Sequence, residues 1–174
     1  MSDGAVEAIE RAGAADIPIL LDLMSEFYAE SEHSLDRAWA GNSFGQLLGD
    51  RARGGAWIAR AGGEPAGYVV LVLRHSMEFG GLGGIIDDLF VRPAQRRKGF
   101  GAGLMDAAFE ECRRLGAVAV EVEVGDDNAV AANLYRGYGL VEVDGGRVHL
   151  AVRQLDPCRR CKPSGAVRVC PGSL

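Results

Sequence analysis

Residues 86–101 of the chain read IDDLFVRPAQRRKGFG, a strand-like run that leads through a basic, glycine-containing loop into a helical pattern. Three consecutive cations occupy the loop, Arg96, Arg97 and Lys98. They stand where the start of a helix leaves backbone amides unpaired, a favourable place for an anion. Gly99 and Gly101 let the backbone approach that anion closely. The stretch therefore predicts a site for a pyrophosphate or a ribose phosphate.

Two common phosphate motifs do not fit this loop. A dinucleotide-binding turn requires a third glycine where the chain has Leu104, and a P-loop requires Ser or Thr directly after its lysine. A solvated basic start of a helix is the remaining alternative. The strand-like run before the loop and the helical pattern after it favour the anion site over that alternative.

The rest of the chain alternates between strand-like and helix-like patterns. Helical spacing of apolar residues predicts helices at 14–30, within 35–50 (with Ser43 as a candidate cap), at 99–115 and at 128–136. Strand-like runs occur at 6–10, 56–60, 66–74, 85–91, 117–124, 139–143 and 147–153, and residues 79–84 read as a glycine-rich connection. This order implies a mixed sheet with helices on both sides. The strict alternation of valines in 117–124 places Glu121 and Glu123 on one shared face.

The composition indicates a single domain, which we place at residues 1–155. The chain has 174 residues and is 48% hydrophobic, enough to enclose one core. Residues 156–174 are expected to form a flexible tail. The tail holds three cysteines, Cys158, Cys161 and Cys170. A structural zinc site would want a fourth ligand, so no metal is expected.

The charge and hydropathy exclude several classes of partner. A net charge of -5 argues against a nucleic-acid binder, which needs a basic face, and it suits a cationic substrate. The chain lacks a run of roughly 20 apolar residues, and its first residues do not read as a secretory signal. We therefore expect a cytoplasmic protein that binds neither nucleic acid nor membranes.

Two separated motifs resemble those of the GNAT acetyltransferases. The family motif R/Q-x-x-G-x-G/A matches residues 96–101, directly behind a strand-like run. Further along, the family pattern N-x-x-A-x-x-x-Y-x-x-x-G-F is matched by Asn128, Ala131, Tyr135 and Gly139, with Leu140 in place of the final Phe. The resemblance spans roughly residues 6–155 and rests on two motifs in the right order.

The resemblance implies an α/β fold with a GNAT-like mixed, mostly antiparallel sheet of six to seven strands flanked by about four helices. Its central parallel strands, a bulged strand at 87–91 and the strand at 117–124, would splay apart to form a cleft for acetyl-coenzyme A, the acyl donor. The main chain of Leu89 and Val91 would pair with the pantetheine arm as with an added strand, and a backbone amide there would polarise the thioester carbonyl. The implied cofactor-binding residues are Leu89, Phe90, Val91, Arg96, Arg97, Lys98, Gly99, Phe100, Gly101, Ala102 and Asn128.

The resemblance also implies the catalytic groups. Attack of an amine on a thioester needs one group that accepts a proton and one that protonates the departing thiolate. Tyr135 stands where family members carry the phenol that protonates the thiolate. Asp87 is the first candidate for the base, acting through water, and Glu123 is the second. Asp88 should face away from Asp87 unless a bulge reverses the order. The structural alternatives are core packing for the tyrosine and solvation for the carboxylates.

The acceptor amine is expected to contact Tyr28, Glu30, His33 and Glu78, which lie in or near the first two helices and the loop at 77–84. The leading hypothesis is an N-acetyltransferase that moves an acetyl group to a primary amine of a small molecule or a protein by direct attack. The alternative is a non-catalytic acyl-CoA-binding sensor with the same fold. A monomer and a homodimer are both compatible with the sequence.

Overall fold

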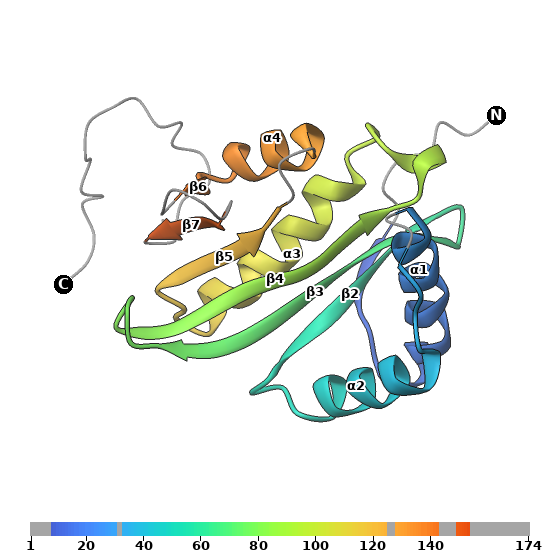
Figure 1. Ribbon diagram of the computed structural model, residues 1–174, viewed down its shortest axis with the longest axis horizontal. Helices are drawn as coiled ribbons and strands as arrows, with labels where there is room; N and C mark the ends of the chain where they lie inside the picture. Colours follow the sequence, from blue (N-terminus) through green and yellow to red (C-terminus); the bar gives the residue numbers. More distant parts are fainter. Residues whose placement is uncertain (1–7, 31–32, 125–127, 143–148, 154–174) are drawn as a thin grey trace.

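The computed structural model describes residues 8–30, 33–124, 128–142 and 149–153. In these ranges seven strands form one sheet in the order β1-β2-β3-β4-β5-β7-β6, and four α-helices accompany it (Figure 1). The elements are β1 (Ala8–Arg11), α1 (Ile17–Glu30), α2 (Arg37–Gly49), β2 (Gly54–Ala61), β3 (Glu64–Ser76), β4 (Gly81–Val91), α3 (Phe100–Arg114), β5 (Ala119–Glu123), α4 (Ala129–Gly137), β6 (Val141–Glu142) and β7 (His149–Arg153). Of the strand pairs described, β4 and β5 are parallel and the others antiparallel. The predicted fold class is confirmed.

The sheet separates two hydrophobic cores. On one face, α3 packs a stripe that includes Leu104, Phe109 and Cys112 against the central strands. On the other face, α1 and α2 cover a second core around Leu20, Leu23, Phe44, Tyr68 and Phe90. None of the helices in the described ranges is long and apolar enough to cross a membrane.

The alternation predicted for β5 is present. Val120 and Val122 lie in the core under α3, and Glu121 faces the other side of the sheet. Glu121 is nevertheless 2% exposed, because Arg74 of β3 lies beside it and donates from Nε to Oε2 at 3.1 Å. The sequence did not indicate this ion pair, whose partners are far apart in the chain.

The central parallel pair separates part of the way along β4. The β4–β5 ladder runs from Gly83 opposite Ala119 to Ile86 opposite Val122 and ends there, whereas β4 continues to Val91 along β3. At this point the β3–β4 register shifts: Leu71 pairs with Ile86 and Val70 with Asp88, so Asp87 is the extra residue of a β-bulge. Figure 1 shows the ends of β4 and β5 diverging beyond the bulge.

Two boundaries differ from the sequence-based prediction. Residues 81–84, expected in a connection, are the start of β4 and pair with residues 73–76 of β3. The glycine at position 84 is required because the α3 core leaves no room there for a side chain. The second helix begins at Arg37 rather than near Ser43, since Asp36 caps it by accepting a hydrogen bond from the Trp39 amide at 3.0 Å.

We expect Gly84→Ala to lower the free energy of unfolding by about 1–3 kcal/mol, as overpacked cores do. An ideal Cβ at Gly84 would lie 2.6 Å from Cys112 Sγ and 3.0 Å from Leu71 Cδ1, and both residues are fully buried. The matched control is Gly45→Ala on the exposed side of α2, where nothing lies within 4 Å. It should gain about 0.5–1 kcal/mol. Urea unfolding measures both, and equal values for the two variants would contradict this packing.

Candidate active site

The start of α3 has the geometry of an anion site. Two residues of the preceding loop are left-handed, Arg97 with φ 62° and Gly99 with φ 89°. The Gly103 amide makes the first bond of the helix, to the Gly99 carbonyl at 2.9 Å, and no side chain caps this end. The amides of residues 100–102 therefore have no acceptor within the helix and lie at the positive end of its dipole. An ideal Cβ at Gly101 would lie 3.3 Å from Leu134 Cδ2, so α4 closes over the same turn.

Arg96 does not extend from this loop as a phosphate ligand. Its Nη2 donates to both carboxylate oxygens of Glu30 at 2.6 and 2.7 Å, and its Nε donates to the Val91 carbonyl at 2.8 Å. Arg96 and Glu30 therefore bind each other in this structure, and their contacts with the cofactor and with an acceptor amine stay predictions. Arg97 and Lys98 are exposed in the same loop, and Lys98 donates to the Gln95 side chain at 3.2 Å.

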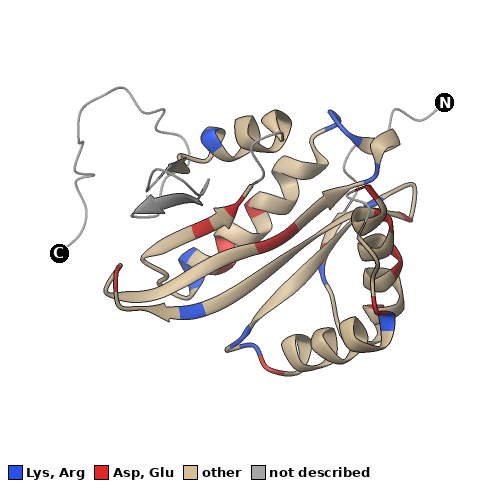
Figure 2. Ribbon diagram, viewed as in Figure 1, with Lys and Arg blue, Asp and Glu red and all other residues tan. Residues whose placement is uncertain are grey.

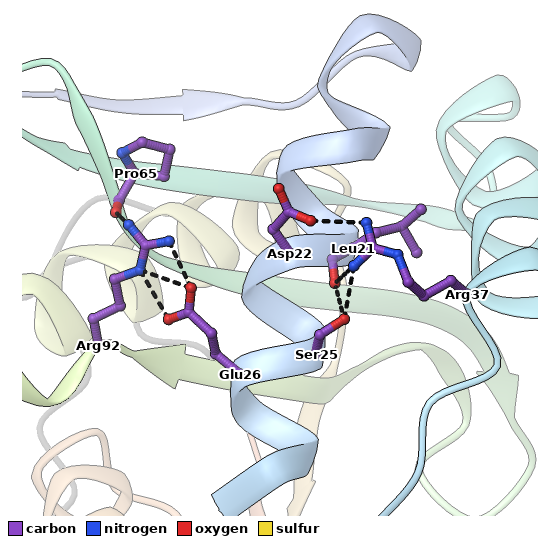
Figure 3. A network of polar contacts seen from close by, with 7 residues as sticks. All are labelled: Leu21, Asp22, Ser25, Glu26, Arg37, Pro65 and Arg92. Atoms are coloured by element: carbon purple, nitrogen blue, oxygen red, sulfur yellow. Dashed lines mark hydrogen bonds and ion pairs between the residues drawn. The ribbon is translucent and has the colours of Figure 1, made fainter.

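A second arginine ties α1 to the end of β4. Arg92 donates to both oxygens of Glu26 at 2.7–3.2 Å and, from Nη1, to the Pro65 carbonyl at 2.6 Å (Figure 3). On the other side of α1, Arg37 of α2 donates to Asp22 at 2.7 Å and to Ser25 at 2.8 Å. These contacts fix the orientation of α1 beside the diverging end of β4.

Beyond the bulge, β4 presents an open backbone edge. The Arg92 amide donates to the Ala66 carbonyl at 2.9 Å, and Phe90 pairs with Tyr68. Because the groups of an antiparallel strand alternate in direction, the N–H and C=O groups of Leu89 and Val91 point away from β3, to the side that β5 has left. Such an edge can pair with an extended ligand. The Val91 carbonyl is held by Arg96 in this structure.

Two adjacent carboxylates, Asp87 and Asp88, lie at the bulge, where β4 and β5 begin to diverge. Asp88 accepts a hydrogen bond from the Tyr68 hydroxyl at 2.9 Å. Burial raises the pKa of Asp88 to about 6; the Tyr68 hydrogen bond opposes this rise, and the charge of Asp87 adds to it. Burial, and then the charge of Glu123, raise the pKa of Asp87. The strand is not regular here, so the alternative of a bulge, which the sequence left open, is the one present.

Two tyrosines from helices lie near these carboxylates. Tyr135 of α4 is 5% exposed, and its pKa is raised to about 12 by burial and by the charge of Asp88. The pKa of Tyr28 of α1 is also raised, by burial and then by the charges of Asp88 and Asp87. Four elements, α1, β4, β5 and α4, thus contribute a phenol or a carboxylate to one place. Figure 2 shows the acidic segments of β4 and β5 next to each other where the strands begin to separate.

Three other predicted residues have different outcomes. Asn128 caps α4, since its Oδ1 accepts a hydrogen bond from the Ala131 amide at 3.1 Å. His33 follows α1 and is exposed, with its amide bonded to the Tyr28 carbonyl at 3.0 Å. Glu78 lies in the turn before β4. Six strand residues, 81–86, which span about 20 Å, separate that turn from Asp87. The contact of Glu78 with an acceptor amine stays a prediction.

Tyr68 is the functional candidate that sequence reasoning missed. It is fully buried in the middle of β3, and burial also raises the pKa of its phenol. A signal was present, because a tyrosine in the apolar run AGYVVLVL needs a hydrogen-bond partner when it is buried. The identity of that partner depended on the bulge. Among the described residues, no three His, Cys, Asp or Glu side chains are grouped as metal ligands.

Solved proteins share this fold. A solved integron cassette protein from the mobile metagenome of Cole Harbour Salt Marsh is 37% identical, with a TM-score of 0.70, over 89% of this chain and 91% of its own. A predicted acetyltransferase from Clostridium acetobutylicum, solved with acetyl-CoA, is 15% identical, with a TM-score of 0.69, over 80% of this chain and 92% of its own; it shows the shared fold.

In sequence, the L-ornithine N5-acetyltransferase NATA1 of Arabidopsis thaliana is 36% identical over 74 residues, which make up 42% of this chain and 32% of that protein. The chain thus matches about a third of the length of this relative. The family model described as "Acetyltransferase (GNAT) family" matches residues 18–140, and it includes the bulged strand, the start of α3 and Tyr135. From this match and the shared fold, we conclude that the chain belongs to the acetyltransferase (GNAT) family.

Proposed function

We propose that the protein transfers an acetyl group from acetyl-coenzyme A to a primary amine of a small molecule or a protein, by direct attack of the amine. One observation carries this proposal: the open edge of β4 leads directly into the amide-lined start of α3. An edge that pairs with an extended amide chain, followed by an anion site, matches the order of pantetheine and pyrophosphate in coenzyme A.

The residues present fit this ligand. The amides of residues 99–102, with Arg97 and Lys98 beside them, would hold the pyrophosphate, and Gly101 leaves the space that a Cβ would fill. The main chain of Leu89 and Val91, on either side of Phe90, would hold the pantetheine arm. When bound, acetyl-coenzyme A supplies an activated acetyl group as a thioester. Asn128 remains a predicted contact whose side chain caps α4.

Tyr135 is suited to give a proton to the departing sulfur. Its pKa of about 12 keeps the phenol protonated throughout the neutral range, so the proton is present when the thiolate forms. The carboxylates at the bulge are suited to accept the proton of the amine, because a pKa raised toward neutrality combines an ionised base with useful basicity.

The site favours an acceptor that carries a second positive charge. Asp87, Asp88 and Glu123 form no ion pair with the described residues, whereas Glu26, Glu30 and Glu121 are each paired with an arginine. An ammonium group that does not react would compensate this charge. The relative named L-ornithine N5-acetyltransferase has an acceptor with two amino groups, which agrees with such a preference.

The alternative is a sensor that binds acyl-coenzyme A without turnover. The convergence of Tyr135 with two carboxylates favours the enzyme, since a sensor has no need of paired proton donors and acceptors. Release of coenzyme A thiol, measured across a panel of mono- and diamines, separates the two. Binding of acetyl-coenzyme A without amine-dependent thiol release would favour the sensor.

Gly101→Asp should abolish binding of coenzyme A, because it adds a negative charge at the start of α3 where the pyrophosphate is proposed to lie. Gly101→Asn is the matched control, since it brings similar bulk against Leu134 without the charge. Calorimetric titration should give an affinity at least roughly tenfold lower for the Asp variant than for the Asn variant. Equal affinities of the two folded variants would rule out this placement of the pyrophosphate.

Tyr135→Phe should lower turnover by about 10²–10⁴-fold and leave the affinity for coenzyme A unchanged, because the ring still packs and only the proton donor is lost. Tyr138→Phe removes another hydroxyl from the end of α4, one that bonds to the Ala102 carbonyl and to Asp106. This control should affect stability more than turnover. Wild-type turnover of Tyr135→Phe at every pH would show that the sulfur takes its proton from solvent.

Glu123→Gln should raise the KM for a diamine by up to about fivefold and change the KM for a monoamine of equal length little, because an exposed charge pair contributes modestly. Glu110→Gln changes the net charge equally on the exposed side of α3 and is the control. Steady-state kinetics with 1,4-diaminobutane and butylamine make the comparison. An equal change for both amines would refute a second ammonium site at Glu123.

A further inference from the structure

The hydroxyl of Tyr68 is enclosed between the sheet and the α1 side of the molecule. The residue is 0% exposed, and its ring lies against Phe90, with 6.4 Å between the ring centroids. Its oxygen is 2.9 Å from Oδ2 of Asp88, the one side chain that it bonds in the described part of the chain. A buried hydroxyl with a single carboxylate partner constrains where that carboxylate can lie.

The bulge makes this contact possible. Phe90 pairs with Tyr68, and Asp88 pairs with Val70, so all four residues belong to the face that α1 covers. Without the extra residue Asp87, the residue at 88 would belong to the α3 face. Asp88 is thus half-buried and fixed, whereas Asp87 is more exposed than Asp88 and has no hydrogen-bond partner among the described residues.

Four titratable groups from different elements surround Asp88. Tyr68 comes from β3 and Asp87 from β4, while Tyr28 of α1 and Tyr135 of α4 are close enough for their pKa values to respond to its charge. The charge of Asp87 also raises the pKa of Tyr28. Asp88 is therefore the bulge carboxylate whose charge acts on both tyrosines.

We propose that Asp88, and not Asp87, accepts the proton of the attacking amine, and that Tyr68 is a positioning residue that holds the Asp88 carboxylate in place at the bulge. This inference rests on the proposed acetyl transfer. As the bond from nitrogen to the acetyl carbon forms, the nitrogen loses one proton to Asp88. As the carbon–sulfur bond breaks, the sulfur takes one proton from Tyr135. Return of the proton from Asp88 to the Tyr135 phenolate restores both groups.

The Tyr68 hydroxyl has a second effect, on the acidity of Asp88. A donated hydrogen bond stabilises the charged carboxylate and so opposes the rise in pKa that burial causes. Removal of the hydroxyl must therefore raise the pKa of Asp88 further. Because a base works only when it is deprotonated, the acidic limb of the kcat/KM profile should move to higher pH in Tyr68→Phe.

The first experiment measures this limb. Tyr68→Phe should shift it upward by about one pH unit or more, the effect of losing a hydrogen bond to a charged group. Val69→Ala, which shortens the neighbouring fully buried residue on the opposite face, controls for loss of stability and should leave the limb in place. Asp88→Asn should remove the limb, and Asp87→Asn should keep it. A limb that disappears with Asp87→Asn, or that does not move in Tyr68→Phe, would overturn the proposal.

The second experiment does not depend on turnover. The carboxyl carbon of Asp88, followed by NMR through a pH titration of the free protein, should titrate near 6 in the wild type and at higher pH in Tyr68→Phe. An unchanged midpoint would overturn the role of Tyr68 whether or not the protein transfers acetyl groups. If the expected shift occurs while no amine releases thiol, the acetyl transfer has failed and the Tyr68–Asp88 contact stands. If Tyr68→Phe does not fold, the Asp87→Asn and Asp88→Asn profiles still decide which carboxylate is the base.

Discussion

The rest of the site depends on one extra residue in β4. Up to Ile86, β4 is hydrogen-bonded on both sides; at Asp87 the bulge adds a residue opposite β3, and the ladder to β5 ends beside it. A bulge increases the local twist, so the end of β4 turns away from β5 and leaves its backbone edge open. The same insertion moves Asp88 onto the face shared with Tyr68. The open edge and the buried carboxylate are therefore two consequences of one irregularity.

The ion pairs around α1 matter for position more than for stability. Glu26 and Glu30, one turn apart, each receive an arginine from the segment that joins β4 to α3. Partly exposed pairs of this kind add little to the free energy of unfolding, but bidentate contacts fix direction. They hold the end of α1 over the diverging strands, where the charges of Asp87 and Asp88 reach Tyr28.

Unlike Glu26 and Glu30, the carboxylates at the bulge have no arginine partner among the described residues. Asp88 is partly desolvated beside the like charge of Asp87, and its hydrogen bond comes from a neutral phenol instead of an arginine. Such an arrangement raises pKa values and costs stability in the free protein. A cationic ligand would remove that cost, because it would place a positive charge beside these carboxylates. Sites that break the local rules of stability in this way are commonly the functional ones.

Local patterns in the chain were enough to predict the succession of strands and helices, the alternation in β5 and the start of α3, because periodicity and glycine placement are local properties. They also placed Tyr135 and the basic loop. Only the tertiary structure decided that Arg96 binds Glu30, that Asp88 meets Tyr68, and that Glu78 lies far from the bulge. The Asp88–Tyr68 contact depends on the register between β3 and β4, because one inserted residue reverses the faces of the strand residues that follow. No local pattern records where that insertion falls, since it is set by how two distant strands pair.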